Sequence, residues 1–185
     1  MLKCFQRLIY ADLLRYQGHE SKKRALRSYS IYPGFRFSVW FRLHEHALDS
    51  GWPKVARKFL TWAVLRHSLK TGIQINAGAR IGGGLYMPHF GGIVVNPDAV
   101  IGKNCYLSHN VLIGKVHAGK RVGVPVIGDD VFIGTGACIV GNVKVGNNAV
   151  IGLNSVVIDD VPENAFVAGS PARVVNYSGA DSHLS

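Results

Sequence analysis

The feature that most constrains this chain is an aliphatic residue that returns at every sixth position from Ile75 to about Pro162. The repeats begin as INAGAR and IGGGLY and end as IGLNSV and VIDDVP. Six residues form one short strand and one corner, and three such units close a triangular coil, so the period predicts a parallel β-solenoid. The segment lacks the three- and four-residue apolar spacing of a helix, and so many in-phase repeats argue against an ordinary sandwich.

Residue types within each repeat indicate which side chains face inward. The aliphatic residue at position one points into the core, and the small or apolar residue at position five does the same, as at Ala79, Cys105 and Ala149. Gly, Asn and Asp at positions two to four are typical of corners, where unusual backbone angles are needed. The solenoid domain is therefore expected over residues 72–177, with a polar tail over 178–185.

Two interruptions of the period mark the places where function is expected, because an insertion must leave a solenoid as a loop. The first is MPHFGGIV from Met87, which is two residues longer than a repeat. The second is GKVHAGKRVGVPV after Ile113, a loop over residues 114–125. Its basic residues are typical of an arm that reaches toward an anionic ligand, namely Lys115, His117, Lys120 and Arg121.

Two histidines stand at the third position of their repeats, His89 and His109. They are separated by one 18-residue turn plus the two-residue insertion, so they are expected on neighbouring rungs of one edge. A neutral imidazole accepts a proton from a hydroxyl near neutral pH, which acyl transfer to an alcohol requires. A zinc site of His89, His109 and His117 is the alternative, as in solenoid carbonic anhydrases, but a close His pair is absent and no metal is expected.

The N-terminal third is predicted to be helical, over residues 1–30, 35–48 and 53–69. Residues 1–70 hold 14 Lys or Arg against 4 Asp or Glu, whereas residues 71–185 hold 7 against 7. A basic amphipathic segment over residues 1–71 favours an anionic partner, such as a membrane surface or an anionic substrate. Nucleic acid is not expected because no recognition motif accompanies the charge. The other interpretation is that these helices only cap the open end of the solenoid.

The remaining composition favours a cytoplasmic protein, peripheral to the inner face of the membrane if the basic helices bind lipid. The three cysteines, Cys4, Cys105 and Cys138, have neither metal-ligand nor disulfide spacing, which is typical of free thiols in a reducing compartment. The N-terminal residues alternate charge with apolar side chains and show no signal peptide. No stretch reaches the roughly 18 apolar residues of a spanning helix.

From Gly72 to Val175 the chain resembles the hexapeptide-repeat acyltransferases, in particular the serine acetyltransferase-like branch. HFGGIVVNPDAVIG from His89 is similar to the family's segment with the catalytic histidine, and VPENAFVAGSPARVV is similar to its closing motif. The resemblance implies a mainly β, left-handed parallel β-helix, a homotrimer, and acetyl-CoA bound between adjacent subunits. It also implies that His89 is the general base, with an oxyanion held by backbone N–H groups. Because His109 is in register with His89, it is expected either to assist His89 or to bind the acceptor.

Two departures from that branch point to a different acceptor. The aspartate that orients the catalytic histidine is replaced by Gln74, which leaves Asp98, His109 or a backbone carbonyl for that role. An Arg-His pair that helps hold the amino acid is replaced by Gly123 and Val124. The segments SIYPGFRFSVWFRLHEH and GVPVIGDDVFIG resemble the sugar O-acetyltransferases of capsule and exopolysaccharide gene clusters, whose acceptors are hydroxyls of lipid-linked or polymeric glycans.

The sequence thus predicts an acetyl-CoA-dependent O-acetyltransferase that modifies a sugar hydroxyl in surface polysaccharide biosynthesis. The alternatives are a serine O-acetyltransferase of cysteine biosynthesis and a non-catalytic solenoid scaffold that docks at the membrane. Residues expected to contact the acceptor are His117, Lys120, Arg121 and Asp98. Residues expected to contact the cofactor are small corner residues beside its long arm and basic residues beside its phosphates, namely Gly114, Lys115, Gly134, Ala137, Gly152, Ala168, Gly169 and Arg173.

Overall fold

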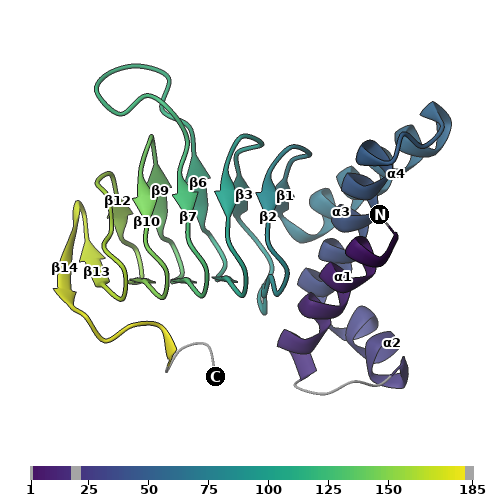
Figure 1. Ribbon diagram of the computed structural model, residues 1–185, viewed down its shortest axis with the longest axis horizontal. Coiled ribbons are helices and arrows are strands. Elements are labelled where there is room, and N and C mark those ends of the chain that lie inside the picture. Colours follow the sequence, from purple (N-terminus) through teal and green to yellow (C-terminus); the bar gives the residue numbers. More distant parts are fainter. Residues whose placement is uncertain (1, 18–21, 182–185) are drawn as a thin grey trace.

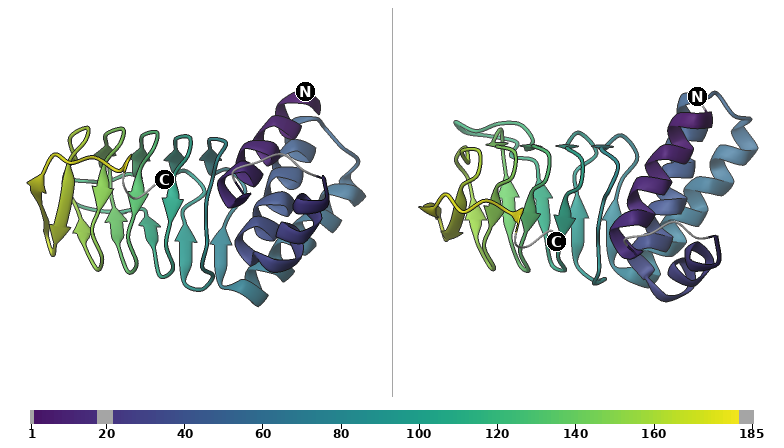
Figure 2. Two further views of the ribbon diagram at one scale, coloured as in Figure 1. Left: turned by 90° about the horizontal axis from the view of Figure 1, so that it is seen from below. Right: turned by 60° about the horizontal axis from the view of Figure 1, so that its bottom comes forward.

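The structure is a computed structural model that describes residues 2–17 and 22–181. Four helices come first, α1 (Leu2–Gln17), α2 (Lys22–Ile31), α3 (Pro33–Asp49) and α4 (Lys54–Thr71), and they pack at one end of a long stack of coils (Figure 1). Two further views show the same arrangement, with the helices together at one end and the C-terminal segment lying along the coils (Figure 2). The molecule is therefore a solenoid with a helical region at its N-terminal end.

In the described part of the chain, fourteen short strands follow the helices and form three sheets. Sheet A has the order β1-β3-β6-β9-β12, sheet B has β10-β7-β4-β2, and sheet C has β14-β13-β11-β8-β5. The bounds in sheet A are β1 (Ile73–Ile75), β3 (Ile93–Val95), β6 (Leu112–Gly114), β9 (Cys138–Val140) and β12 (Val156–Val157). Those in sheet B are β2 (Arg80–Ile81), β4 (Val100–Ile101), β7 (Val126–Ile127) and β10 (Lys144–Val145). Those in sheet C are β5 (Tyr106–Leu107), β8 (Phe132–Ile133), β11 (Val150–Ile151), β13 (Phe166–Gly169) and β14 (Ala172–Asn176).

The strand register confirms the six-residue period and both of its interruptions. Val95 pairs with Ile113, 18 residues further along the chain, which is one regular coil. Ile75 pairs with Val95, which is 20 residues and includes the insertion beside His89. Ile113 pairs with Ile139, which is 26 residues and includes the loop after β6. All pairings among the solenoid strands are parallel until the closing hairpin of β13 and β14.

The core of the solenoid is a column of the two inward-facing positions of the repeat. Ile113, Ile133 and Ile139 at position one are fully buried, and so are Cys105 and Val111 at position five. At the corners, six of the described Asn or Asp residues adopt the left-handed backbone conformation, namely Asn104, Asn110, Asp130, Asn148, Asn154 and Asn164. These residue types enter that region at low cost, which is why they occur at the corners of the repeat.

The helical region caps the open end of the first coil, as one interpretation of the sequence expected. Phe37 and Phe41 of α3 and Val64 of α4 are buried in the same cluster as Ile73 and the other coil residues. Helix α4 ends at Gly72, whose left-handed φ of 67° lets its N–H bond to the Ser68 carbonyl before the chain enters β1. The first coil is therefore covered by the aromatic side chains of Phe37 and Phe41.

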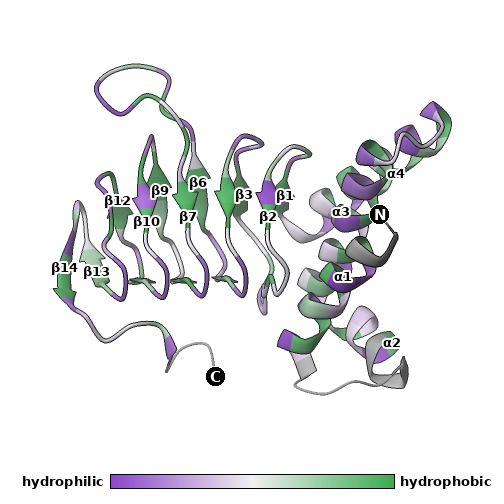
Figure 3. Cartoon of the chain, in the orientation of Figure 1, coloured by the Kyte–Doolittle hydropathy of each residue, from purple (hydrophilic) through white to green (hydrophobic). Residues whose placement is uncertain are grey.

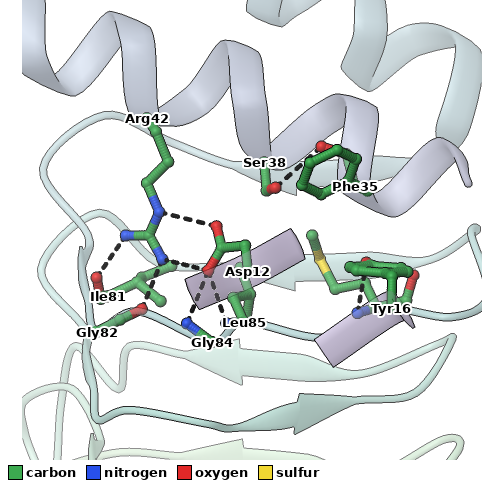
Figure 4. Close-up of polar contacts among 10 residues, drawn as sticks. Asp12, Tyr16, Phe35, Ser38, Arg42, Ile81, Gly82, Gly84 and Leu85 are labelled. Atoms are coloured by element: carbon green, nitrogen blue, oxygen red, sulfur yellow. Dashed lines mark hydrogen bonds and ion pairs between the residues drawn. The ribbon is translucent and has the colours of Figure 1, made fainter. Parts of the chain in front are cut away.

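A buried polar cluster fastens α1 to α3 and to the first coil (Figure 4). Asp12 and Arg42 form an ion pair with an N–O distance of 3.2 Å, and their side chains are 0% and 3% exposed. Asp12 Oδ1 also accepts hydrogen bonds of 2.8 Å from the N–H groups of Gly84 and Leu85. Arg42 donates to the carbonyls of Ile81 and Gly82. Every charge in this cluster is therefore satisfied without solvent.

The predicted helix over residues 1–30 is wrong in one respect, because the structure has two helices there. The sequence carries Gly18 between α1 and α2, and glycine costs about 1 kcal/mol in a helix interior. Of the predicted tail, residues 182–185 lie outside the described part, while Ala180 donates its N–H to Asn148 Oδ1 at 2.8 Å. None of the described helices is long and apolar enough to cross a lipid bilayer.

Candidate functional site

The chain passes from sheet A to sheet B to sheet C in every coil, so the solenoid has three edges. We name the corner between sheets C and A the C–A edge and the corner between sheets A and B the A–B edge. His89 and His109 precede β3 and β6, and therefore lie on the C–A edge. Asp98 and the loop over residues 114–125 follow the same two strands, and therefore lie on the A–B edge.

The two histidines lie on neighbouring rungs, as the sequence predicted. Their ring centroids are 5.9 Å apart and the ring planes are nearly perpendicular, at 89°. His109 is half-buried and its Nδ1 lies 3.5 Å from Thr135 Oγ1 on the next rung. His89 is exposed, and no hydrogen bond to its ring forms within the described part of the chain. An exposed imidazole with a free nitrogen can take a proton from an incoming hydroxyl.

Thr135 is a site residue that the sequence reasoning missed. It lies 26 residues after His109, which is one 18-residue coil plus the eight residues by which the loop lengthens its turn. The register of the repeat therefore places it directly beside His109 on the C–A edge. Counting rungs across the loop would have found it.

Gln74 is an exposed residue of β1 and makes no side-chain hydrogen bond within the described residues. It lines a cavity of about 590 Å³ between α4 and sheet A, together with His44, Thr61 and Asn76. Gln74 is thus open to a ligand on sheet A. Asp98 does not contact His89. Its carboxylate instead pairs with Lys115 at 2.9 Å on the A–B edge.

The loop over residues 114–125 is a hairpin that projects from the solenoid (Figure 1). Val116 and Gly123 exchange two backbone hydrogen bonds of 3.0 Å. Arg121 turns toward the C-terminal coils, where it pairs with Asp159 at 2.9 Å and Asp160 at 3.5 Å. His117 and Lys120 are exposed and pair with nothing in the described part of the chain.

Within one chain the structure does not bring the predicted acceptor residues to the histidines. His89 and His109 lie on the C–A edge, and the predicted contacts lie on the A–B edge, on the far side of sheet A. The same separation keeps His117 away from His89 and His109 within one chain. Among the described residues no group of three His, Cys, Asp or Glu side chains could hold a metal ion.

The predicted cofactor residues divide between the same two edges. Gly134 and Gly152 follow strands of sheet C and lie on the histidine edge, and Ala168 and Gly169 are the last two residues of β13 in the same sheet. Gly114 and Lys115 lie on the A–B edge, while Arg173 in β14 lies 3.6 Å from Asp159. A Cβ at Gly134 would come within 2.9 Å of the Ile151 carbonyl oxygen, so coil stacking alone requires glycine there.

Ala137 must be removed from the predicted cofactor contacts. It stands at position five of its repeat, and its side chain is 0% exposed within the core of the solenoid. A pantetheine arm lying on the surface of the coils cannot reach it. A small residue is suited to contact with the cofactor arm only where its side chain faces the surface, and position five of the repeat faces the core.

The described cysteines do not offer a nucleophile. Cys105 is buried in the core, and burial raises the pKa of its thiol to about 12. Burial also raises the pKa of the half-buried Cys138 thiol. Because only the thiolate attacks a thioester readily, both stay protonated and inert at neutral pH. The side chain of Cys4 lies outside the described residues. The site is thus suited to direct transfer assisted by an imidazole.

Comparisons with known proteins place this geometry in a family. The Hexapep family, described as bacterial transferase hexapeptide (six repeats), matches residues 125–159. The serine acetyltransferase of Synechococcus elongatus is 33% identical over 168 residues, which cover 89% of this chain and 66% of that protein. The serine acetyltransferase of Staphylococcus aureus is 32% identical over 164 residues, covering 89% of this chain and 75% of the relative. The chain thus spans about two thirds to three quarters of its curated relatives.

Similar solved structures are also serine acetyltransferases. The crystal structure of Neisseria gonorrhoeae serine acetyltransferase in complex with serine matches with a TM-score of 0.76 and 34% identity, covering 92% of this chain and 69% of that one. A serine acetyltransferase in complex with CoA matches with a TM-score of 0.76 and 30% identity, covering 92% and 69%. The predicted left-handed parallel β-helix behind an N-terminal helical segment is confirmed, as is the resemblance to hexapeptide-repeat acyltransferases.

The same comparisons correct the predicted acceptor. The prediction of a sugar O-acetyltransferase for capsule or exopolysaccharide synthesis, with a glycan or lipid-linked saccharide acceptor, is wrong because the relatives are serine acetyltransferases. The prediction rested on three positions, Gln74, Gly123 and Val124, and on short strings, whereas the similarity to serine acetyltransferases extends over 168 residues. The chain belongs to the serine acetyltransferase family of hexapeptide-repeat transferases.

Proposed function

We propose that the protein transfers the acetyl group of acetyl-CoA to the hydroxyl of serine, with His89 as general base. The observation that carries this proposal is the His89–His109 pair, whose rings are 5.9 Å apart on the open C–A edge of a serine acetyltransferase-family solenoid. Relatives of this fold have been solved with serine and with CoA. The proposal keeps the predicted chemistry and replaces the predicted acceptor.

In this reaction an imidazole nitrogen of His89 removes the proton of the serine hydroxyl as its oxygen attacks the thioester carbonyl. The carbon–sulfur bond of the tetrahedral intermediate then breaks, and the imidazolium returns the proton to the leaving thiolate. The products are O-acetylserine and CoA. His109, which lies beside Thr135, packs edge-on against the His89 ring and helps to position it.

We further propose a homotrimer in which each site lies between two subunits. The histidines and the basic loop of one chain lie on opposite edges of sheet A, so a site that uses both needs the loop of a neighbour. In that arrangement the C–A edge of one subunit faces the A–B edge of the next. The acetyl-CoA arm would lie along Gly134, Gly152, Ala168 and Gly169 of one subunit, with Gly114 and Lys115 of the other beside it.

Lys120 is the residue we assign to the serine carboxylate. Gly123 has no side chain, so the loop offers no cation at position 123. Its φ of 138° is one that an arginine at this position would adopt only with strain. Lys115 and Arg121 are occupied by Asp98, Asp159 and Asp160. Lys120 is exposed and forms no ion pair in the described part of the chain, which leaves its ammonium available to an anionic substrate.

The test measures CoA release from acetyl-CoA with L-serine as acceptor. His89→Ala should lower kcat roughly 10²- to 10⁴-fold, the usual contribution of a general base. His67→Ala, a half-buried histidine on α4, is the matched control and should retain activity. Turnover of His89→Ala at the wild-type rate contradicts the assignment. Failure of the wild-type chain to bind acetyl-CoA by calorimetry would instead support a non-catalytic scaffold.

A second measurement separates binding from chemistry. Lys120→Ala should raise KM for serine roughly tenfold with little change in kcat, because an exposed charge that only binds substrate acts equally in ground and transition states. Lys103→Ala, an exposed lysine on another edge of the coils, serves as the control. An unchanged KM would remove Lys120 from the acceptor site without affecting the role of His89.

A further inference from the structure

Helix α4 has a second apolar face that nothing in the described chain covers. Its inner face buries Leu60, Ala63 and Val64 against α3 and the first coil. The other face carries large apolar side chains that are between 53% and 81% exposed and follow one another at three- or four-residue steps, namely Val55, Phe59, Trp62, Leu65 and Leu69. Figure 3 shows hydrophobic and hydrophilic residues alternating along this helix, at the end of the molecule farthest from β14. The exposed row is as long as the helix itself.

Five basic residues and no acidic residue accompany this apolar row, namely Lys54, Arg57, Lys58, Arg66 and Lys70. Among the described residues, none of them forms an ion pair. By contrast, Arg42 pairs with Asp12 and Arg121 pairs with Asp159. The Arg66 guanidinium lies 5.6 Å from the centroid of the Trp62 ring. The charge of α4 is therefore uncompensated, and it lies directly beside the apolar row.

The charge decides which partner fits. A second copy that met this face through its own α4 would bring two uncompensated rows of positive charge together, which is unfavourable. An anionic surface would neutralise them. The row of Val55, Phe59, Trp62 and Leu69 needs an apolar phase, and long basic side chains extend from such a phase to reach its charged boundary. A bilayer containing anionic lipid provides both.

We propose that α4 lies flat on the surface of an anionic phospholipid bilayer, with its outer apolar row inserted among the acyl chains. Such a helix rests at the headgroup boundary, buried by about 5–10 Å, with basic residues at the level of the phosphates and aromatic residues at the interface. Trp62 and Phe59 occupy the middle of the row, and Lys58 and Arg66 flank them. The contact is peripheral, and it does not depend on the proposed acetyl transfer.

The test is flotation of the full chain with vesicles of phosphatidylcholine alone or with about one third phosphatidylglycerol. We expect binding to the anionic vesicles only, weakened by salt. Two double variants should each weaken binding on the order of tenfold or more. One removes apolar side chains (Trp62→Gln with Leu69→Gln), and the other reverses basic charges (Lys58→Glu with Arg66→Glu). Leu153→Gln, whose side chain is 67% exposed on the coils, and Lys103→Glu are the matched controls and should bind as wild type.

Three outcomes overturn the proposal. They are no binding to anionic vesicles, equal binding to both vesicle types, and binding that the α4 variants do not change. Sedimentation equilibrium adds a fourth, since a smaller oligomer of the Trp62→Gln, Leu69→Gln variant would mean that a second copy covers this face. All these residues are exposed, so each variant is expected to fold, and its circular dichroism spectrum checks this. His89→Ala should bind vesicles as wild type, so the membrane contact and the acetyl transfer fail separately.

Discussion

The solenoid and the helical region differ in how they reach a stable core. In the solenoid one rule is repeated, and each coil contributes the same inward-facing positions to a continuous apolar column. The helical region has no repeat, and it is fastened to the first coil by contacts that occur once, above all the buried Asp12–Arg42 pair (Figure 4). Charge follows the same division, since the basic excess lies within residues 1–70 and the rest of the chain is balanced.

This difference teaches that the two parts should respond differently to substitution. A repeated contact is one of many similar ones, so its loss is felt in its own coil and the neighbouring coils. A contact that occurs once cannot be replaced by another. The helical region should therefore be more sensitive at a single polar position than the solenoid is at a single apolar one.

Removal of the Asp12 carboxylate should give the largest effect. Asp12→Ala leaves the buried Arg42 guanidinium without its counter-ion and the N–H groups of Gly84 and Leu85 without an acceptor, at a cost of about 3–5 kcal/mol. Urea denaturation measures the loss, and limited proteolysis should cut the helices before the coils. Asp159→Ala, at an exposed pair, should cost under about 1 kcal/mol. Equal losses for the two variants would show that Asp12 does not fasten the helices.

Truncation of one apolar residue in the coils should cost somewhat less. Ile139→Ala removes a fully buried side chain between the rungs of Ile113 and Val157, and we expect a loss of about 2–5 kcal/mol in urea denaturation. Leu153→Ala, at an exposed corner position, should stay within about 0.5 kcal/mol of wild type. Proteolysis of Ile139→Ala should begin in the coils. Cleavage that still begins in the helices would contradict the independence of the two regions.

The smallest effect concerns pH and the helical region. His44 is buried below α4, with its Nε2 3.0 Å from Thr61 Oγ1, and burial lowers its pKa from the ordinary 6.5. The unfolded chain then binds more protons than the folded one just below pH 6.5, so the free energy of unfolding decreases as pH falls through that window. His44→Gln should flatten the decrease, as measured by urea denaturation between pH 5 and 7. An unchanged slope would mean that His44 does not couple to folding.

Much of the fold could be predicted from the sequence because period and side-chain direction are linked within a coil. The aliphatic and small positions of the repeat gave the core, and the two interruptions gave the insertion beside His89 and the loop after β6. The His89–His109 pair followed from counting along the same repeat. The acceptor could not be predicted this way, since Gly123 and Val124 show which side chains are lost from the loop and not which groups take their place.

The sequence by itself determined the solenoid, its core and the neighbouring rungs of His89 and His109, because these depend on a six-residue spacing along the chain. Only the tertiary structure decided that the histidines and the loop lie on opposite edges of sheet A. It alone also showed that Arg121 is held by Asp159 and Asp160, and that Asp12 and Arg42 meet. These contacts join residues 30 or more positions apart, and such distances are set by how coils and helices stack and not by any local pattern.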